Sequence, residues 1–219
     1  MQRMFDIVFS VLALLVLAPL LVPVVVVLRL TGEGEVFYRQ QRVGQGGRHF
    51  GLLKFATMLK NSPSIGTGTV TVAEDPRILP VGHFLRKTKI NELPQLLNIL
   101  AGDMSVVGPR PLTPNEFGAY SPEVQAAVAR VPPGLTGIGS VVFRDEENLL
   151  RGQRRVEFYE RVIAPYKGAL EQWYVARRSL AVYFQLICIT AWVVLFPRSR
   201  VVWRAFPDLP PPPPELGLA

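Results

Sequence analysis

The segment KTKINELPQLLNILAGDMSVVGPRP, residues 87–111, combines basic residues, an amide–acid pair, an apolar helix pattern and a Gly-Pro-Arg-Pro turn. Leucines at positions 93, 96, 97 and 100 recur at helical spacing, which predicts a helix with one buried face. We expect Asn91 to cap this helix and Gly102 to end it, because these residue types favour those positions. Pro94 would lie in the first turn, where its missing N–H costs little.

The same segment contains the groups that a phosphate site needs. The free N–H groups at the start of a helix attract anions, and Lys87, Lys89 and Arg110 flank the predicted helix. The plainer interpretation is a capped amphipathic helix with basic flanks, and helix mechanics alone favour it. The rest of the chain decides between the two.

Composition indicates membrane association and an anionic partner. The 219 residues are 49% hydrophobic and 19% charged, and the apolar excess is concentrated at the two ends. The net charge of +7 suits lipid headgroups, nucleotides or nucleic acid. A single cysteine, Cys188, excludes an internal disulfide, and the separated His49 and His83 do not predict a transition-metal site. A hard cation held by carboxylate and phosphate oxygens stays open.

Residues 1–32 contain an apolar run long enough to span a bilayer as one straight helix. Pro19 and Pro23 interrupt this run, and each removes a backbone hydrogen bond and favours a kink. Basic residues flank both ends, so the positive-inside rule selects no orientation. We therefore favour a re-entrant helix, broken at Pro19, that enters and leaves by one leaflet. A plain transmembrane helix is the alternative, and a signal peptide is disfavoured because Asp6 lies in its basic region.

The remaining pattern predicts a mainly helical α+β fold. Alternating β-branched and aromatic residues around the glycine-rich turn Gly44–Gly47 predict a β-hairpin, and helical patterns follow at 114–130 and 156–174. The expected organisation places a cytoplasmic catalytic domain at 33–178, an apolar interfacial helix at 179–197, and a proline-rich, disordered tail at 198–219.

A series of short blocks then resembles one family. In chain order they are Arg3-x-x-Asp6, Gln40-x-Arg42-x-Gly44, Lys54-Phe-Ala-Thr-Met58, Asp75-Pro-Arg77, Asn91-Glu-Leu-Pro-Gln95, Gly102-Asp-Met-Ser105, Gly108-Pro-Arg-Pro111 and Pro133-Gly-Leu-Thr-Gly137. Their order and approximate spacing, from about residue 3 to 195, are similar to those of the bacterial sugar transferases, the monotopic phosphoglycosyl transferases.

The resemblance implies transfer of a phosphosugar from a UDP-sugar to undecaprenyl phosphate, giving undecaprenyl-diphosphate sugar and UMP. This is the first membrane step in the assembly of a bacterial polysaccharide, O-antigen or glycoprotein glycan. It implies a re-entrant membrane helix, Mg²⁺ as cofactor, and a location at the cytoplasmic face of the inner membrane. An anionic lipid surface is a further expected partner, and a homo-oligomer is compatible with the sequence. Nucleic acid is not an expected partner, because no nucleic-acid-binding motif is present.

This sequence departs from the family pattern at three positions. Asn91 replaces the usual nucleophilic Asp, Ala56 replaces an Arg, and Ala18 replaces the Ser that commonly precedes the helix-breaking proline. An amide is a poor nucleophile, so Asn91 cannot take the carboxylate role. We hypothesise that Asn91 and Ala56 together replace a charge pair.

Roles follow from the resemblance and from side-chain chemistry. Glu92 is assigned as nucleophile, base or metal ligand, and Asn91 as a group that orients a phosphate oxygen or a metal-bound water. Asp103 is a candidate second metal ligand, although a turn residue is the preferred interpretation. The candidates for binding phosphate are Lys54, Arg110, Arg77 and Lys89, and the residues assigned structural roles near the site are Asp75, Pro94, Gln95, Pro109 and Pro111.

Three mechanisms stay open at this point. Glu92 acts as nucleophile in two steps, or the lipid phosphate attacks directly in a ternary complex, or the chain is an inactive membrane-bound protein that binds a nucleotide sugar or polyprenyl phosphate.

Overall fold

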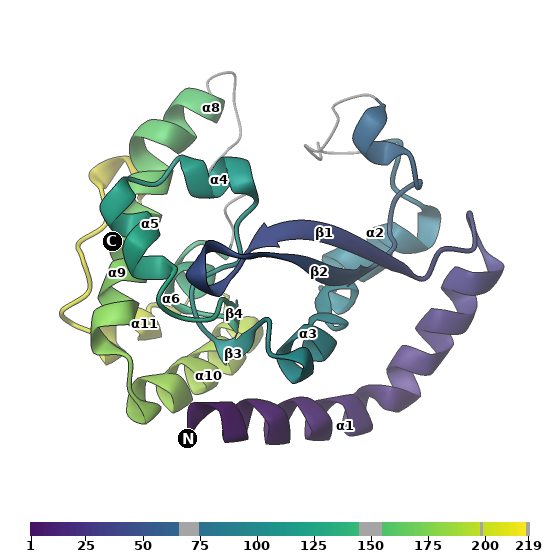
Figure 1. Cartoon of the computed structure of the whole chain (residues 1–219), viewed down its shortest axis with the longest axis horizontal. Helices are drawn as coiled ribbons and strands as arrows, with labels where there is room; N and C mark the ends of the chain where they lie inside the picture. Colours follow the sequence, from purple (N-terminus) through teal and green to yellow (C-terminus); the bar gives the residue numbers. More distant parts are fainter. Residues whose placement is uncertain (66–74, 145–154, 198, 218–219) are drawn as a thin grey trace. The chain divides into compact units, whose positions relative to one another are not determined.

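A computed structural model describes residues 1–65, 75–144, 155–197 and 199–217 (Figure 1). The described chain is mainly helical with two small two-stranded sheets, which confirms the α+β class. It divides into two compact units, and each is discontinuous in sequence. The first contains residues 3–41 and 51–102, and the second contains residues 42–50 and 103–219.

The first unit begins with α1 (Gln2–Leu30), the one helix in the described ranges that is long and apolar enough to cross a membrane. Pro19 and Pro23 lie inside it, and helical hydrogen bonding continues past both. Figure 1 shows α1 changing direction along its length, as internal prolines commonly cause. The structure therefore gives one bent helix where a helix broken at Pro19 was expected.

Apolar packing joins α1 to the rest of the first unit. Leu28 near its C-terminus is buried with Phe55 and Leu85, and partly buried Val24 and Val25 pack against this cluster. At the other end of α1, the Arg3 guanidinium donates to the carbonyls of Ile99 and Leu100, 2.7 Å for the second. Ile99 O also accepts from Gly102 N at 3.1 Å, and both carbonyls lie in the last turn of α3, where a cation is favourable.

The predicted hairpin is present. Strands β1 (Phe37–Val43) and β2 (His49–Phe55) pair with each other across the short 3-10 turn η1 (Gln45–Gly47). Gly46 and Gly47 have φ values of 69° and 73°, which glycine adopts without a steric penalty. The next elements are the 3-10 turn η2 (Ser62–Ser64) and α2 (Pro80–Lys87).

The central segment folds as the 3-10 turn η3 (Ile90–Glu92) followed by α3 (Gln95–Ala101). The prediction of Asn91 as the helix cap is wrong, because Lys89 precedes η3 and Pro94 precedes α3. Pro94 has no N–H to donate, and the neighbouring amides make the tighter bonds of 3-10 turns, including that from Leu93 N to Ile90 O at 3.1 Å. Gly102 ends α3 with φ 97°, as predicted.

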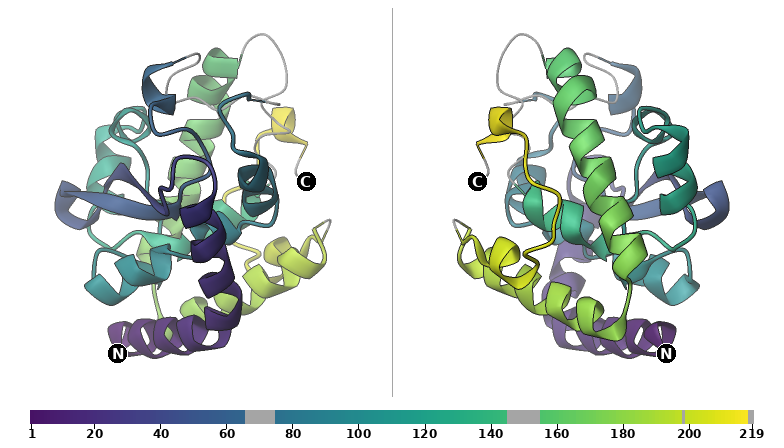
Figure 2. Two further views of the ribbon diagram at one scale, coloured as in Figure 1. Left: turned by 90° about the vertical axis from the view of Figure 1, so that its right-hand side faces the viewer. Right: turned by 90° about the vertical axis from the view of Figure 1, so that its left-hand side faces the viewer.

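The second unit contains a short parallel sheet and several helices. Strand β3 (Ser105–Val107) pairs in parallel with β4 (Gly134–Thr136). The helices between residues 114 and 142 are α4 (Pro114–Gly118), α5 (Pro122–Val128) and α6 (Ile138–Val142). Further along, α8 (Arg155–Phe158), the π-helical turn η4 (Tyr159–Ile163) and α9 (Ala164–Arg177) follow one another as one long helical rod (Figure 2).

The helix α10 (Leu180–Leu195) lies within the second predicted apolar segment. One side of it is buried, including Tyr183 and Leu186. Large apolar side chains on the rest of its surface are exposed, including Trp192 at 48% and Leu195 at 72%. The exposed apolar surface therefore continues to the C-terminal end of α10.

The C-terminal segment differs from the disordered tail that its prolines suggested. It forms α11 (Val201–Ala205) and the 3-10 turn η5 (Pro214–Leu216), and it runs beside α9 (Figure 2). Phe206 packs edge-on against Trp173 of α9, with ring centroids 5.0 Å apart, and Asp208 accepts from the Trp173 indole N–H at 3.2 Å. Tyr166 donates to Pro210 O at 2.9 Å. One aromatic contact and two hydrogen bonds therefore attach this segment to α9.

Candidate active site

The structure brings Glu92 and Lys54 together. Glu92 is the last residue of η3 and Lys54 lies on β2, with 4.0 Å between the lysine Nζ and the carboxylate Oε1. Their side chains are 25% and 18% exposed, so both are partly shielded from water and accessible to a solute. An ammonium group and a carboxylate at this distance can contact the same phosphate group. The lysine would attract the negative charge of the phosphate, and the carboxylate would attack its phosphorus or bind a cation.

Asn98 connects the helix after this turn to the strand that carries Lys54. Its Oδ1 accepts from Leu53 N and its Nδ2 donates to Gly51 O, both at 2.9 Å, so one buried amide satisfies two backbone groups of β2. The sequence analysis missed this residue. A polar residue inside the apolar pattern of residues 93–100 was the available signal.

Asn91 is buried, with 7% of its surface exposed. Its Oδ1 has no hydrogen-bond partner in the described part of the chain. A buried polar atom without a partner costs free energy, and such atoms in native structures need an explanation. A bound group that donates to Oδ1, or a cation, would satisfy it.

Lys89, two residues before Asn91, has a strained backbone. Its φ of 60° is the one positive value for a residue other than glycine among the described residues. Lys89 is exposed, and its carbonyl accepts from Glu92 N at 3.0 Å, which closes the turn. Left-handed residues of this kind concentrate at functional sites, where the surroundings hold them in place.

Asp75 and Arg77 form a buried pair that braces the loop before α2. The Arg77 Nε and Nη2 donate to the two Asp75 oxygens at 2.8 and 2.6 Å. The remaining nitrogen, Nη1, donates to the carbonyls of Ser62 and Ile65. Arg77 is 5% exposed and its side-chain donors are used within the chain, so the geometry favours a bracing role over the predicted phosphate-binding role.

Two residues that were assigned structural roles, Pro94 and Gln95, follow Glu92 closely in the chain. Pro94 and Gln95 are buried at the start of α3, where the first shapes the turn. Asp103 and Arg110 belong to the second unit. Asp103 is an exposed residue directly after the glycine that ends α3, as its preferred interpretation as a turn residue requires.

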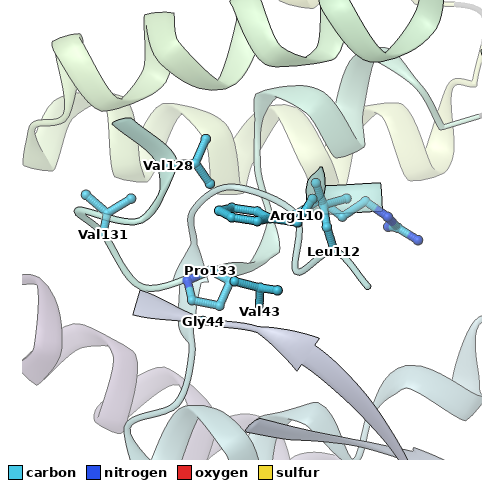
Figure 3. Close-up of a pocket in the computed structure, with 8 residues that line it drawn as sticks. Val43, Gly44, Arg110, Leu112, Val128, Val131 and Pro133 are labelled. Atoms are coloured by element: carbon cyan, nitrogen blue, oxygen red, sulfur yellow. The ribbon is translucent and has the colours of Figure 1, made fainter. Parts of the chain in front are cut away.

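Arg110 is the exposed residue of an otherwise buried loop, the Gly-Pro-Arg-Pro loop of residues 108–111. Pro109 and Pro111 on either side of it are buried. Figure 3 shows its guanidinium extending away from the apolar side chains of Val43, Leu112 and Val131. The hollow between them has a volume of about 10 Å³, roughly that of one water molecule, so it does not hold a sugar.

No group of three or more His, Cys, Asp or Glu residues that would enclose a metal ion occurs in the described ranges. Glu92 and the unpartnered Asn91 oxygen are the oxygen donors at the turn. Magnesium is usually held by one or two carboxylates together with substrate phosphates and water, so a sparse donor set of this type fits that ion.

Comparison with known proteins identifies the family. The model of the bacterial sugar transferase family matches residues 1–197, and the chain belongs to this family. The exopolysaccharide production protein ExoY of Sinorhizobium fredii is 36% identical over 159 residues, which cover 66% of this chain and 70% of that protein.

Two further relatives have more specific names. The undecaprenyl-phosphate galactose phosphotransferase of Salmonella typhimurium is 34% identical over 209 residues, covering 89% of this chain and 40% of that protein. The undecaprenyl-phosphate glucose phosphotransferase of Komagataeibacter xylinus is 38% identical over 157 residues, covering 66% and 30%. The chain thus spans less than half the length of these two relatives.

Proposed function

We propose that this protein transfers a phosphosugar from a UDP-sugar to undecaprenyl phosphate, with release of UMP, as the first membrane step of glycan assembly. Family membership and the names of its phosphotransferase relatives support this activity. The observation that carries it is the Lys54–Glu92 pair at the strained turn after Lys89. The inactive alternative has no supporting observation beyond Asn91 itself.

The side chains at the turn divide the work of phosphoryl transfer. Lys54 and Lys89 attract the diphosphate of the UDP-sugar, which reduces the charge repulsion that an attacking anion meets. A Glu92 oxygen attacks the sugar-linked phosphorus, the bond from that phosphorus to the UMP oxygen breaks, and UMP leaves. An oxygen of undecaprenyl phosphate then attacks the same phosphorus and releases Glu92. Asn91 orients a phosphate oxygen or a water.

Mg²⁺ is the proposed cofactor, held by Glu92 and Asn91 with substrate phosphates completing its ligands. When bound, the ion supplies positive charge to the diphosphate. Glu92 therefore has two proposed roles, and substitution of Glu92 removes both.

The proposed location is the cytoplasmic face of the bacterial inner membrane. The bend in α1 and the basic residues at both of its ends support a re-entrant path, and the exposed apolar surface of α10 supports an interfacial position on the anionic lipid. The test replaces Cys188 by Ser and then introduces one cysteine, either at Met1 or at Glu33. A re-entrant path predicts that a membrane-impermeant thiol reagent labels both variants from the cytoplasmic side. Labelling of the two positions from opposite sides would favour the transmembrane alternative.

The test of activity is UMP release by detergent-solubilised protein over a panel of UDP-sugars, with Mg²⁺ and with or without undecaprenyl phosphate. We expect release with at least one sugar, and a loss of 100-fold or more in Glu92→Gln, on the order of other losses of a charged catalytic group. Glu123→Gln, an exposed acid on α5, is the matched control. Absence of release across the panel from folded protein would contradict the transferase proposal and favour a binding protein.

Two measurements separate the catalytic routes. A phosphosugar adduct on Glu92, detected by intact mass without the lipid, supports the two-step route. Release of UMP that requires undecaprenyl phosphate, without an adduct, supports direct attack in a ternary complex.

The hypothesis that Asn91 and Ala56 replace a charge pair has its own test. Asn91→Asp and Ala56→Arg, made singly and together, should be non-additive in stability and activity, because charges in contact couple. Additive effects would contradict it.

A further inference from the structure

Helix α9 carries buried polar side chains on one face. Lys167, Glu171 and Tyr174 recur at helical spacing and are 5%, 2% and 1% exposed. The Lys167 ammonium lies over the rings of Phe143 and Tyr159, at 5.2 and 5.5 Å from their centroids. Polar groups at this depth are costly, so a structural or functional requirement must hold them there.

Glu171 and Tyr174 bind the backbone around Arg110. The Tyr174 hydroxyl donates to Val107 O at 3.0 Å, and Arg110 N donates to Glu171 Oε1 at 3.3 Å. Prolines 109 and 111 have no N–H, so the Gly-Pro-Arg-Pro loop has two backbone donors, those of Gly108 and Arg110. Gly108 N donates to Thr136 O at 2.9 Å, and Glu171 is the acceptor for the other.

The backbone of Gly139 also lies against the Glu171 carboxylate. Gly139 of α6 approaches it so closely that a Cβ at this position would lie 2.3 Å from Oε1. The carboxylate therefore fits between the backbone of α6 and the backbone of Arg110. Its other oxygen, Oε2, has no hydrogen-bond partner among the described residues.

We propose that Glu171 is a positioning residue, which fixes the backbone of Arg110 so that the exposed guanidinium is held in place to bind an anion. This proposal rests on the proposed function for the identity of the anion. The positioning role itself is supported by the packing of Gly139, Glu171 and Arg110, whichever anion binds. The sequence analysis did not single out Glu171, because nothing in the pattern of α9 indicates which residue faces a distant loop.

The charge state of Glu171 gives this contact a pH dependence. Burial raises the pKa of Glu171 to about 7, against the opposing effects of the Arg110 N–H and the charges of Lys167 and Arg110. These two cations are the charged groups that act on it from α9 and from the loop. The ionised carboxylate is the stronger acceptor, so the Arg110 backbone is held more firmly above pH 7 than below it.

Residue-resolved hydrogen exchange tests the positioning without any substrate. At pH 8, Glu171→Ala should raise the exchange rate of the Arg110 amide about tenfold, the equivalent of one lost hydrogen bond to a charged group. Glu171→Gln, which keeps the shape and an acceptor oxygen, should raise it less than about threefold. Glu123→Gln should leave it unchanged. An Arg110 amide that exchanges at the wild-type rate in Glu171→Ala would overturn the proposal.

Steady-state kinetics of the full-length protein supply the second readout. Glu171→Ala should raise KM for the UDP-sugar about tenfold with kcat within about threefold, because binding of the anion is what Arg110 serves. The wild-type KM should fall as pH rises from 6 to 8, and Glu171→Gln should remove this dependence. A wild-type pH dependence retained in Glu171→Gln would overturn the proposal. If the wild-type protein releases no UMP but the variants show the expected hydrogen-exchange pattern, the proposed function is contradicted and the positioning role of Glu171 is retained.

Discussion

Lys89 holds a backbone conformation that is unfavourable for a residue with a side chain. Its left-handed backbone costs on the order of 1 kcal/mol or more for a side chain that is not glycine. Glycine would adopt φ 60° freely, and its extra freedom in the unfolded chain offsets part of that gain. We propose that the charge of lysine accounts for its presence at this position.

We predict that Lys89→Gly separates stability from activity. Its free energy of unfolding should stay within about 1 kcal/mol of the wild type, because the relieved strain and the added chain entropy oppose each other. UMP release should fall about tenfold through loss of the ammonium group. Thermal unfolding and initial rates check the two parts, with exposed Lys87→Gly, in the last turn of α2, as the comparison. Equal activity in Lys89→Gly and the wild type would contradict the role of this charge.

The raised pKa of Glu171 determines whether the free energy of unfolding rises or falls with pH. Its pKa is raised above the usual value for a glutamate in an unfolded chain, so the folded protein binds the proton more tightly. The stabilisation from that proton is fully present below about pH 4.5 and is lost as the pH rises through about 7. The wild-type protein should therefore lose stability relative to Glu171→Gln between these values.

The measurement is the difference in unfolding midpoint between the two proteins at pH 4.5, 6 and 8. We expect a difference that grows in favour of Glu171→Gln. A constant difference would show that Glu171 does not change its protonation in this range.

At the scale of elements, α3 and β2 depend on one amide for their attachment. Asn98→Ala leaves Leu53 N without its acceptor and Gly51 O without its donor. The free energy of unfolding of Asn98→Ala should fall by about 1–3 kcal/mol, since a buried backbone donor loses its partner. Denaturant unfolding measures the loss. Leu97→Ala, on the exposed side of α3, should cost clearly less, and equal losses in the two variants would contradict the role of the amide.

Local patterns predicted those elements whose causes are local. Glycines with positive φ made the hairpin turn and the end of α3 predictable, since both depend on one residue type at one position. The start of α3 was mispredicted, because Pro94 and the left-handed Lys89 together allow a 3-10 turn that helical spacing does not reveal. The order of the C-terminal segment was missed because it depends on Trp173 and Tyr166, which no local pattern connects to the prolines.

Some residues of the candidate site were assigned from the sequence, whereas others were recognised only in the structure. Glu92 and Lys54 were assigned separate roles at the site, and the structure places their charged groups 4.0 Å apart. Asn98 and Glu171 were not expected, because their functions depend on which distant backbone each faces. Arg77 was assigned to phosphate on its charge, whereas the carbonyls of Ser62 and Ile65 occupy its donors. The sequence gives the charge of a side chain, whereas the groups that it contacts are known only from the fold.

At the scale of the molecule, the C-terminal segment is a structural part of the second unit. Phe206→Ala should cost about 3–5 kcal/mol, the usual range for a buried phenylalanine, because it removes the ring that packs on Trp173. Thermal unfolding in detergent and the rate of proteolysis after residue 197 check this expectation. Exposed Pro211→Ala should behave as wild type. Unchanged proteolysis in Phe206→Ala would contradict the packing of this segment.

The discontinuity of the second unit has a consequence for synthesis on the ribosome. Residues 42–50 at the tip of the hairpin belong with the chain after residue 103, and Arg42 pairs with Glu116, 74 residues later, at 3.0 Å. At translation rates of roughly 5–20 residues per second, the tip is made roughly 4–15 s before its partner. During that interval the tip has emerged without the residues that complete its hydrogen bonds. The first unit can acquire the Lys54–Glu92 pair in the meantime, because both residues are made before Glu116.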